Sequence, residues 1–227
     1  MTRLGVLTGV TAEARVLGVL SGAPPLVACS GADAERARAL AAGLVARGAT
    51  ALVSVGLAGG LAEGWERGTL LLATEVELPD GSVRTVDRAW REDVLTRAHA
   101  AGVHLAGGRL ASARRVMATP ADKRALAEHS GAVAVDMESH AVALAAQTAG
   151  LPFLVLRAVA DPWNAAIPPP ALAGLGPDGT VRALAVAACL AREPWHLPDL
   201  LRLARDSRAG LTSLRAALAR LGTLNPP

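Results

Sequence analysis

Tyrosine is absent from this chain of 227 residues, and lysine occurs once, at Lys123. Only 2% of the residues are aromatic, although 52% are hydrophobic, so the core must be built mainly from alanine, valine and leucine. The two cysteines, Cys29 and Cys189, show neither a metal-binding spacing nor a disulfide framework. This cysteine usage indicates a reduced, cytoplasmic compartment.

Long hydrophobic runs are also missing. A membrane-spanning helix needs roughly 18 consecutive apolar residues, and the longest apolar stretches, around 151–160 and 183–191, fall well short of that. The N-terminal run over 4–7 is too short for the core of a secretory signal. The net charge of +3 is not the signature of a nucleic-acid-binding protein. We therefore expect a soluble protein with no nucleic-acid partner.

Short apolar runs alternate with helical patterns along the first 160 residues. Extended runs are expected at 4–7, 26–29, 51–55, 69–77, 108–112, 132–135 and 151–160. Helices are expected from about 13, over 32–47, over 88–101, from 119 and over 137–149. This alternation predicts a single α/β domain with a central, mixed and mostly parallel β-sheet flanked by helices.

Proline and glycine interrupt the pattern over 161–179, notably at Pro162, at 168–170 and at 177–179, where we expect no regular structure. Beyond this break, leucines at three- and four-residue steps predict amphipathic helices whose other face carries arginines. We assign residues 1–190 to a catalytic domain. Residues 191–227 are expected to form a helical C-terminal extension packed on the same domain.

A glycine-rich segment, GLAGG over 56–60, directly follows the strand expected at 51–55. A loop here would present backbone N–H groups to an anion or a sugar, and a simple tight turn is the alternative. The spacing matches neither the dinucleotide-binding fingerprint nor the P-loop. The five histidines form no ligand pair and no Gly-x-Ser-x-Gly elbow occurs, so metal and serine-nucleophile chemistry have little support.

Charged residues lie at or near the ends of the expected strands. Asp136 and Glu138 come at the start of a helix, where the helix dipole alone would favour carboxylates. Arg157 lies within an otherwise apolar strand, and Asp161 stands at the carboxyl end of that strand, where open α/β sheets bind ligands. A purely structural pair between Arg157 and Asp161 is the alternative. Glu13 follows the first strand in the same way.

Four segments in chain order carry a family resemblance: GVL over 5–7 with Glu13, VGLAGGL over 55–61, VDMES over 135–139 and LRAVAD over 156–161. Together they resemble the nucleoside phosphorylase and nucleosidase superfamily, and most closely its methylthioadenosine/S-adenosylhomocysteine nucleosidase branch. The resemblance covers residues 3–161. It implies cleavage of the bond between a purine and a ribose, without metal or cofactor, by a homodimer or larger homo-oligomer.

The resemblance also implies roles for residues at matching positions. Asp161 would donate a proton to N7 of the purine, which requires a raised pKa. Glu138 would accept hydrogen bonds from the ribose hydroxyls, and Met137 would pack against the sugar. Arg157 and Glu13 would hold and activate the nucleophile. The other expected substrate contacts are Gly56, Ala58, Gly59, Val116 and Met117.

The nucleophile is either water or inorganic phosphate. Hexameric phosphorylases of this superfamily carry Gly-Asp-Pro-x-Arg in the first loop, whereas residues 9–13 here read GVTAE. A carboxylate at Glu13 would repel a phosphate dianion by a few kcal/mol, even at an effective dielectric constant of about 20. We therefore favour hydrolysis over a phosphate-dependent purine nucleoside phosphorylase. Nucleosidases usually place serine or threonine at the position of Leu57, and this departure weakens both assignments.

The last third resembles a narrower group, the hopanoid-associated phosphorylases, in Asp161-Pro162, the prolines at 168–170, GPDG over 176–179 and the Leu/Arg-rich ending. That resemblance implies adenosylhopane as the substrate, with release of adenine. A basic amphipathic C-terminus would suit a peripheral position at the anionic inner membrane surface; helices packed with their arginines outward are the alternative. A catalytically inactive relative that binds a nucleotide-lipid or a partner enzyme is a rival of another class.

Overall fold

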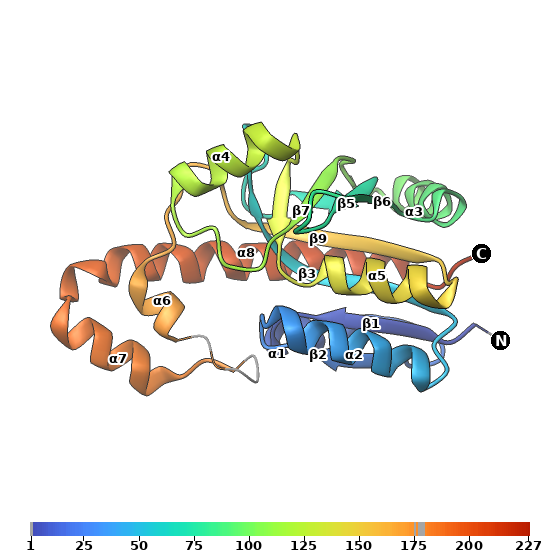
Figure 1. Ribbon diagram of the computed structural model, residues 1–227, viewed down its shortest axis with the longest axis horizontal. Helices are drawn as coiled ribbons and strands as arrows, with labels where there is room; N and C mark the ends of the chain where they lie inside the picture. Colours follow the sequence, from blue (N-terminus) through green and yellow to red (C-terminus); the bar gives the residue numbers. More distant parts are fainter. Residues whose placement is uncertain (1, 175, 177–179) are drawn as a thin grey trace.

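The computed structural model describes residues 2–174, 176 and 180–227. Nine strands form one mixed β-sheet, and helices cover both of its faces (Figure 1). This architecture confirms the predicted α/β fold with a C-terminal helical region. Among the described residues, no helix is both long enough and apolar enough to cross a membrane.

The central strands are β1 (Leu4–Thr8), β2 (Leu26–Cys29), β3 (Ala51–Gly60) and β9 (Phe153–Asp161). β1 pairs in parallel with β2 and β3, and β3 pairs in parallel with β9. Every residue of β9 is buried, as expected for a strand covered on both faces. The short strand β4 (Leu70–Leu72) pairs antiparallel with β9 on its other side.

The sheet branches at the end of β3. Gly59 and Gly60 pair antiparallel with β8 (Ala134–Asp136), and the sheet continues through β7 (Arg109–Ser112), β5 (Glu75–Glu77) and β6 (Val83–Thr85). Gly59 is in register with Asp161 on one side and with Val135 on the other. The carboxyl ends of β3, β8 and β9 therefore meet at one place.

The glycine segment over 56–60 is not the loop that we expected. It continues β3, because β9 pairs alongside it as far as Asp161. Glycine inside a strand often marks the close approach of another group. A Cβ atom at Gly56 would come within 2.6 Å of the carboxyl carbon of Glu13. The segment thus makes room for side chains that pack against the strand.

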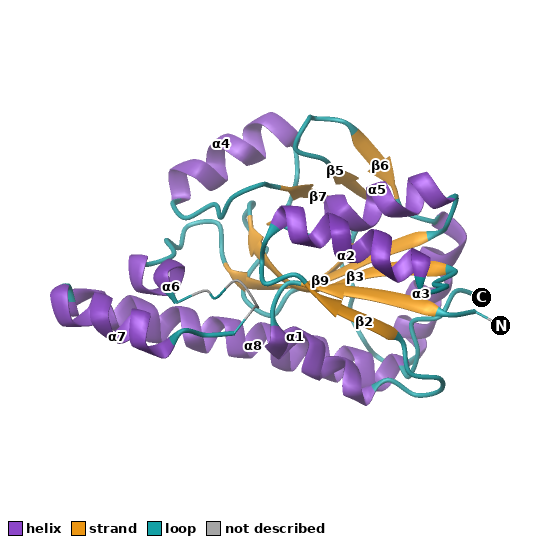
Figure 2. Ribbon diagram, turned by 60° about the horizontal axis from the view of Figure 1, so that its bottom comes forward, coloured by secondary structure: helices purple, strands orange, loops and turns teal. Residues whose placement is uncertain are grey.

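Helices α2 (Ala34–Ala46) and α5 (Ser139–Ala149) pack together on one face of the sheet, and α8 (Leu197–Leu221) crosses the other face (Figure 2). The short α1 (Thr11–Val16) with its 3₁₀ continuation η1 (Leu17–Val19), and α3 (Arg88–Ala100), contact α8. Helix α4 (Pro120–Ser130) begins where the sequence predicts a helix, from 119, and its first turn is stabilised by the capping Thr119 side chain and by a proline.

The proline-rich stretch contains a helix that we did not expect, α6 (Pro169–Ala173). Prolines are tolerated in a first helical turn, whose N–H groups have no intrahelical partner, and this explains the exception. The turn predicted at 177–179 lies outside the described residues. Helix α7 (Ala183–Arg192) and the 3₁₀ turn η2 (Pro194–His196) then lead into α8, and the domain boundary proposed at 190 falls inside α7.

The two halves of α8 have different surroundings. In the inner half Leu214, Leu218 and Leu221 are buried in the core, whereas in the outer half Leu197 and Leu201 are 45% and 57% exposed. In both views α6, α7 and the outer half of α8 project from the domain (Figures 1 and 2). We call residues 168–205, as far as they are described, the arm.

Candidate active site

A cavity of about 360 Å³ opens at the meeting point of β3, β8 and β9. Such a position, outside the carboxyl ends of strands, is where α/β sheets generally bind ligands. Most of the residues that we predicted for the site line this cavity: Glu13, Ala58, Gly59, Val116, Met117, Met137, Glu138 and Asp161. The two exceptions, Gly56 and Arg157, lie behind the wall rather than in it.

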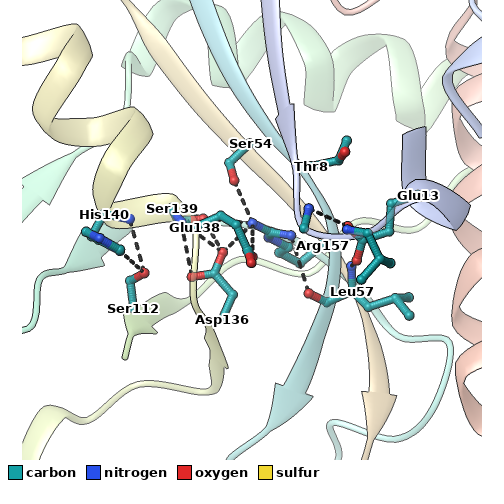
Figure 3. A network of polar contacts seen from close by, with 12 residues as sticks. Thr8, Glu13, Ser54, Leu57, Ser112, Asp136, Glu138, Ser139, His140 and Arg157 are labelled. Atoms are coloured by element: carbon teal, nitrogen blue, oxygen red, sulfur yellow. Dashed lines mark hydrogen bonds and ion pairs between the residues drawn. The ribbon is translucent and has the colours of Figure 1, made fainter. Parts of the chain in front are cut away.

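Arg157 is fully buried and forms the centre of a polar network (Figure 3). Its guanidinium pairs with the carboxylate of Asp136, donates to Ser54 Oγ at 2.6 Å and lies 3.4 Å from Glu138 Oε2. The alternative that we considered, a pair between Arg157 and Asp161, is therefore not formed. Arg157 holds the carboxyl groups of Asp136, the last residue of β8, and of Glu138, two residues later, and it is not among the residues that line the cavity.

The network places three buried carboxyl groups, Glu13, Asp136 and Glu138, around one guanidinium. Burial raises the pKa of Glu138 to about 8 against the opposing charge of Arg157, and the charges of Asp136 and Glu13 add to the rise. The protonated form of Glu138 is therefore favoured. A protonated carboxyl group can both donate and accept hydrogen bonds, which suits a partner with hydroxyl groups.

The carboxylate of Glu13 is bound by the backbone of two strand-end segments. Its Oε2 accepts hydrogen bonds from the N–H groups of Gly9 and Val10 at 2.7 and 3.0 Å, and its Oε1 accepts one from Leu57 N–H at 2.8 Å. Burial raises the pKa of Glu13, and Arg157 opposes the rise. N–H groups that could have bound an external anion are therefore occupied by a carboxylate of the protein itself.

Glu13 and Glu138 lie close together, while Asp161 belongs to another part of the wall. A Cβ atom at Gly9 would be 2.8 Å from Glu138 Oε1 and 3.3 Å from Glu13 Oε2, so this glycine separates the two carboxyl groups. A Cβ atom at Gly59 would instead be 3.2 Å from Asp161 Oδ2. The cavity is thus lined by Glu13 and Glu138 at the first loop, by Asp136 at the end of β8 and by Asp161 at the end of β9.

Asp161 is only 8% exposed and pairs with Lys123, whose Nζ lies 2.5 Å from Asp161 Oδ2. Burial raises the pKa of Asp161, Lys123 opposes the rise, and the nearby charge of Asp206 adds to it. The sequence motifs did not predict Lys123 as a site residue, although it comes from the first part of α4 and also lines the cavity. Its status as the single lysine was the only available signal.

The cavity also has a mainly apolar part that was not predicted. Leu203, Ser207 and Leu211 of α8 line it at four-residue steps, together with Ile167 from the segment after β9. The helical spacing of these residues is visible in the sequence, but nothing in that spacing says which face of the helix meets a cavity. The C-terminal helix therefore belongs to the site as well as to the core.

The model of the family described as the phosphorylase superfamily matches residues 8–173 of the chain. The chain belongs to the phosphorylase superfamily. It is thus an enzyme of the nucleosidase and nucleoside phosphorylase type, whose reaction is cleavage of the N-glycosidic bond of a purine nucleoside. No curated protein matches the sequence.

Solved structures with the same fold include several nucleosidases. The 5′-methylthioadenosine/S-adenosylhomocysteine nucleosidase of Neisseria meningitidis, in complex with methylthio-immucillin-A, is similar with a TM-score of 0.72 and 17% identity, over 97% of this chain and 98% of that one. A mutant of the Helicobacter pylori nucleosidase, with 5′-methylthioadenosine in its active site, has a TM-score of 0.67 and 17% identity, over 96% and 98%.

The futalosine hydrolase of Helicobacter pylori is similar over a shorter part, with a TM-score of 0.64 and 20% identity across 71% of this chain and 88% of that one. At such identities these likenesses concern the fold. The match of the family model confirms the superfamily predicted from the sequence motifs, and the substrate within it has to be argued from the chemistry of this cavity.

Proposed function

We propose that this protein is a nucleosidase, which hydrolyses the bond between a purine, adenine, and a ribose-type sugar. The observation that carries the choice of water over phosphate is the Glu13 carboxylate, which accepts hydrogen bonds from three backbone N–H groups. A phosphate dianion at contact distance from this carboxylate would be repelled by a few kcal/mol, even at an effective dielectric constant of about 20. A water molecule is not repelled, and a carboxylate can take its proton.

The cavity offers the groups that such a reaction needs. Cleavage passes through a sugar with positive charge at its anomeric carbon, while negative charge develops on the departing base. In this proposal Glu138 binds the ribose hydroxyls, Met137 packs against the sugar, and the neighbouring Glu13 removes a proton from the attacking water. Asp161, beside Gly59 at the other part of the wall, gives a proton to N7 of the base.

Other predicted residues have supporting roles in the same scheme. Val116, Met117 and Ala58 provide apolar walls for the purine. Arg157 and Gly56 lie behind the cavity wall. The guanidinium contacts Glu138 and Asp136 and holds both carboxyl groups in place, and the missing side chain at Gly56 leaves space for Glu13. The reaction consumes only water and the nucleoside, and we propose no cofactor.

Phosphate dependence tests this proposal. The wild-type protein is expected to release adenine from 5′-methylthioadenosine or adenosine in phosphate-free buffer, and added inorganic phosphate should leave the rate unchanged. The products should be adenine and the free sugar, which chromatography separates from a sugar 1-phosphate. Release that requires phosphate would show the alternative, a phosphorylase. Complete absence of release would favour the inactive, nucleotide-lipid-binding relative.

We propose further that the natural nucleoside carries a large apolar group, as adenosylhopane does. The arm supports this substrate. Among the residues that the structure describes, Val83 is the only exposed large hydrophobic residue outside it. The exposed large hydrophobic residues of the arm are Leu172, Val181, Leu184, Trp195, Leu197 and Leu201.

The arm is continuous with the nucleoside cavity. Leu203 and Leu211 line the cavity, and Leu201 and Leu197 come two and six residues before Leu203, nearer the outer end of the same helix. Exposed arginines accompany them at Arg202 and Arg205, and basic side chains beside apolar ones favour contact with an anionic lipid surface. An apolar group leaving the cavity along α8 would therefore reach the arm.

Substitution of the arm tests the lipid-linked substrate. The triple variant Leu184→Ser, Trp195→Ser and Leu201→Ser should bind vesicles containing phosphatidylglycerol at least about tenfold more weakly, because each lost apolar side chain removes of the order of 1.5–3 kcal/mol of burial. Cosedimentation measures the binding. The triple variant should cleave 5′-methylthioadenosine as the wild type does but lose kcat/KM for a 5′-alkylthio analogue with a long chain.

Val83→Ser is the matched control, because it removes an exposed hydrophobic residue outside the arm. It should change neither vesicle binding nor the preference for the long-chain analogue. Deleting the region after Leu197 would be an unsuitable test, since the inner half of α8 is part of the core. Wild-type vesicle binding and analogue preference in the triple variant would contradict the lipid-linked substrate.

A further inference from the structure

Lys123 is the single lysine of the chain, and its side chain is buried at the wall of the cavity. Its Nζ donates hydrogen bonds to Asp161 Oδ2 at 2.5 Å, to the carbonyl oxygen of Pro162 at 2.8 Å and to that of Ala165 at 3.0 Å. Burying a lysine is costly unless its charge is paired and its donors are satisfied. Here the Asp161 carboxyl group pairs with the charge, and the carbonyl oxygens of Pro162 and Ala165 accept the other two hydrogen bonds.

The three oxygens around Nζ match the ion-paired form of Lys123 and Asp161. An ammonium group has three N–H donors, one for the Asp161 carboxylate and one for each of the two carbonyl oxygens. Asp161 then carries the compensating negative charge. A carboxylate in this ion pair has no proton of its own to give to a purine.

This inference rests on the proposed function, in which Asp161 donates to the base. We propose that Lys123 stores the proton that Asp161 passes to the departing purine, so that the two residues act as one acid. Lys123 acts through Asp161 and does not touch the substrate, which makes it a positioning residue that also holds the proton.

The transfer balances in protons. As the glycosidic bond breaks, its electron pair moves to the base; the N–H bond of Lys123 breaks as an O–H bond forms on Asp161, and the proton of Asp161 moves to N7. Glu13 takes a proton from water while the remaining hydroxide joins the sugar. When the products leave, the proton on Glu13 is lost to solvent and the amine of Lys123 regains one. The net reaction is the addition of water to the nucleoside.

The charged groups around Asp161 make its protonation depend on Lys123. Lys123 of α4 and Asp206 of α8 both face Asp161. Asp206 is itself paired with Arg67 at 2.9 Å. On the cavity rim the charge of Arg115 is compensated by Asp122 at 2.8 Å. Asp206 raises the pKa of Asp161 and Lys123 opposes the rise. Without Lys123, Asp161 would be protonated only below its own raised pKa. The Lys123–Asp161 pair instead keeps a proton up to the higher of its two macroscopic pKa values.

The test uses Lys123→Met and Lys123→Arg with two substrates across a range of pH. For 5′-methylthioadenosine, Lys123→Met should retain adenine release at acidic pH and lose it roughly 100-fold at mildly alkaline pH, where the wild type stays active. Lys123→Arg keeps the positive charge, but a guanidinium does not give up its proton. It should therefore lose alkaline activity as well.

The second substrate, 4-nitrophenyl β-D-ribofuranoside, has a leaving group that needs no proton. Both variants should cleave it within a few-fold of the wild-type rate, which would show that folding and the sugar end of the site are intact. A wild-type pH profile in Lys123→Met, or full adenine release by Lys123→Arg at alkaline pH, would overturn the inference. A wild type that releases no base would instead end the proposed function.

A measurement on the wild type alone covers the case in which both variants fail to fold. Single-turnover rates of adenine release in mixtures of light and heavy water report how many protons move in the rate-limiting step. Two protons in flight, from Lys123 to Asp161 and from Asp161 to N7, should give a curved dependence that is absent for the nitrophenyl substrate. The same linear dependence for both substrates would contradict the relay.

Discussion

Asp161→Asn is expected to lower kcat for adenine release by about 10²–10⁴-fold, because an amide of the same shape cannot transfer a proton to the base. The asparagine oxygen still accepts a hydrogen bond from Lys123, although the loss of its charge leaves the ammonium group unpaired and costs stability of the order of 3–5 kcal/mol. Steady-state kinetics with 5′-methylthioadenosine, together with thermal unfolding, separate the two effects.

The matched control for this variant is Asp122→Asn, which removes a carboxylate from the same region. Asp122 forms its ion pair with Arg115 on the rim of the cavity, whereas Asp161 forms its own with Lys123. The control should keep adenine release close to the wild-type rate, and Asp161→Asn should still cleave 4-nitrophenyl β-D-ribofuranoside. Near-normal adenine release by a folded Asp161→Asn protein would end the proposed acid role.

Glu13→Ala is expected to reduce adenine release by about 10²–10⁴-fold, because it removes the residue that we propose as the base for the attacking water. The substitution also vacates the backbone N–H groups of Gly9, Val10 and Leu57, which now bind the Glu13 carboxylate. A small external carboxylate fits the same donors. Added formate should therefore restore part of the rate, which can be measured against chloride at equal ionic strength.

Two further variants of this protein test whether the effect is specific to Glu13. Glu13→Gln fills the space with a neutral amide, so it should be as impaired as Glu13→Ala but gain nothing from formate. Glu35→Ala removes another first-turn glutamate, in α2, and should behave as the wild type. Full activity in Glu13→Gln would contradict the role of Glu13 as the base.

The fold and much of the cavity lining could be predicted from the sequence, because the carboxyl ends of parallel strands lie at the same edge of a sheet. The charges that follow separate strands, such as Glu13 and Asp161, had to meet wherever the carboxyl ends of those strands met. The apolar runs fixed the strands to within a few residues, as at β2 and β9. Residues as far apart as 13 and 161 could therefore be assigned to one site from the sequence alone.

The features that the sequence did not reveal all depend on contacts between distant elements. Lys123 stands 38 residues before Asp161, and a helical pattern alone does not show which face of α4 turns inward. The glycines over 56–60 resembled a loop, because the pairing with β9 that holds them extended is not a local property. Likewise, the leucine spacing of α8 is the same in its buried and its exposed half.

The central claim is that water, activated by Glu13, displaces adenine protonated by Asp161. The most direct test is mass spectrometry of the sugar product formed by the wild-type protein in ¹⁸O-enriched water with inorganic phosphate present. We expect one ¹⁸O atom at the anomeric carbon of a free sugar, together with an equimolar amount of adenine. A sugar 1-phosphate without enrichment, or no release of adenine from any adenosyl compound, would contradict the claim.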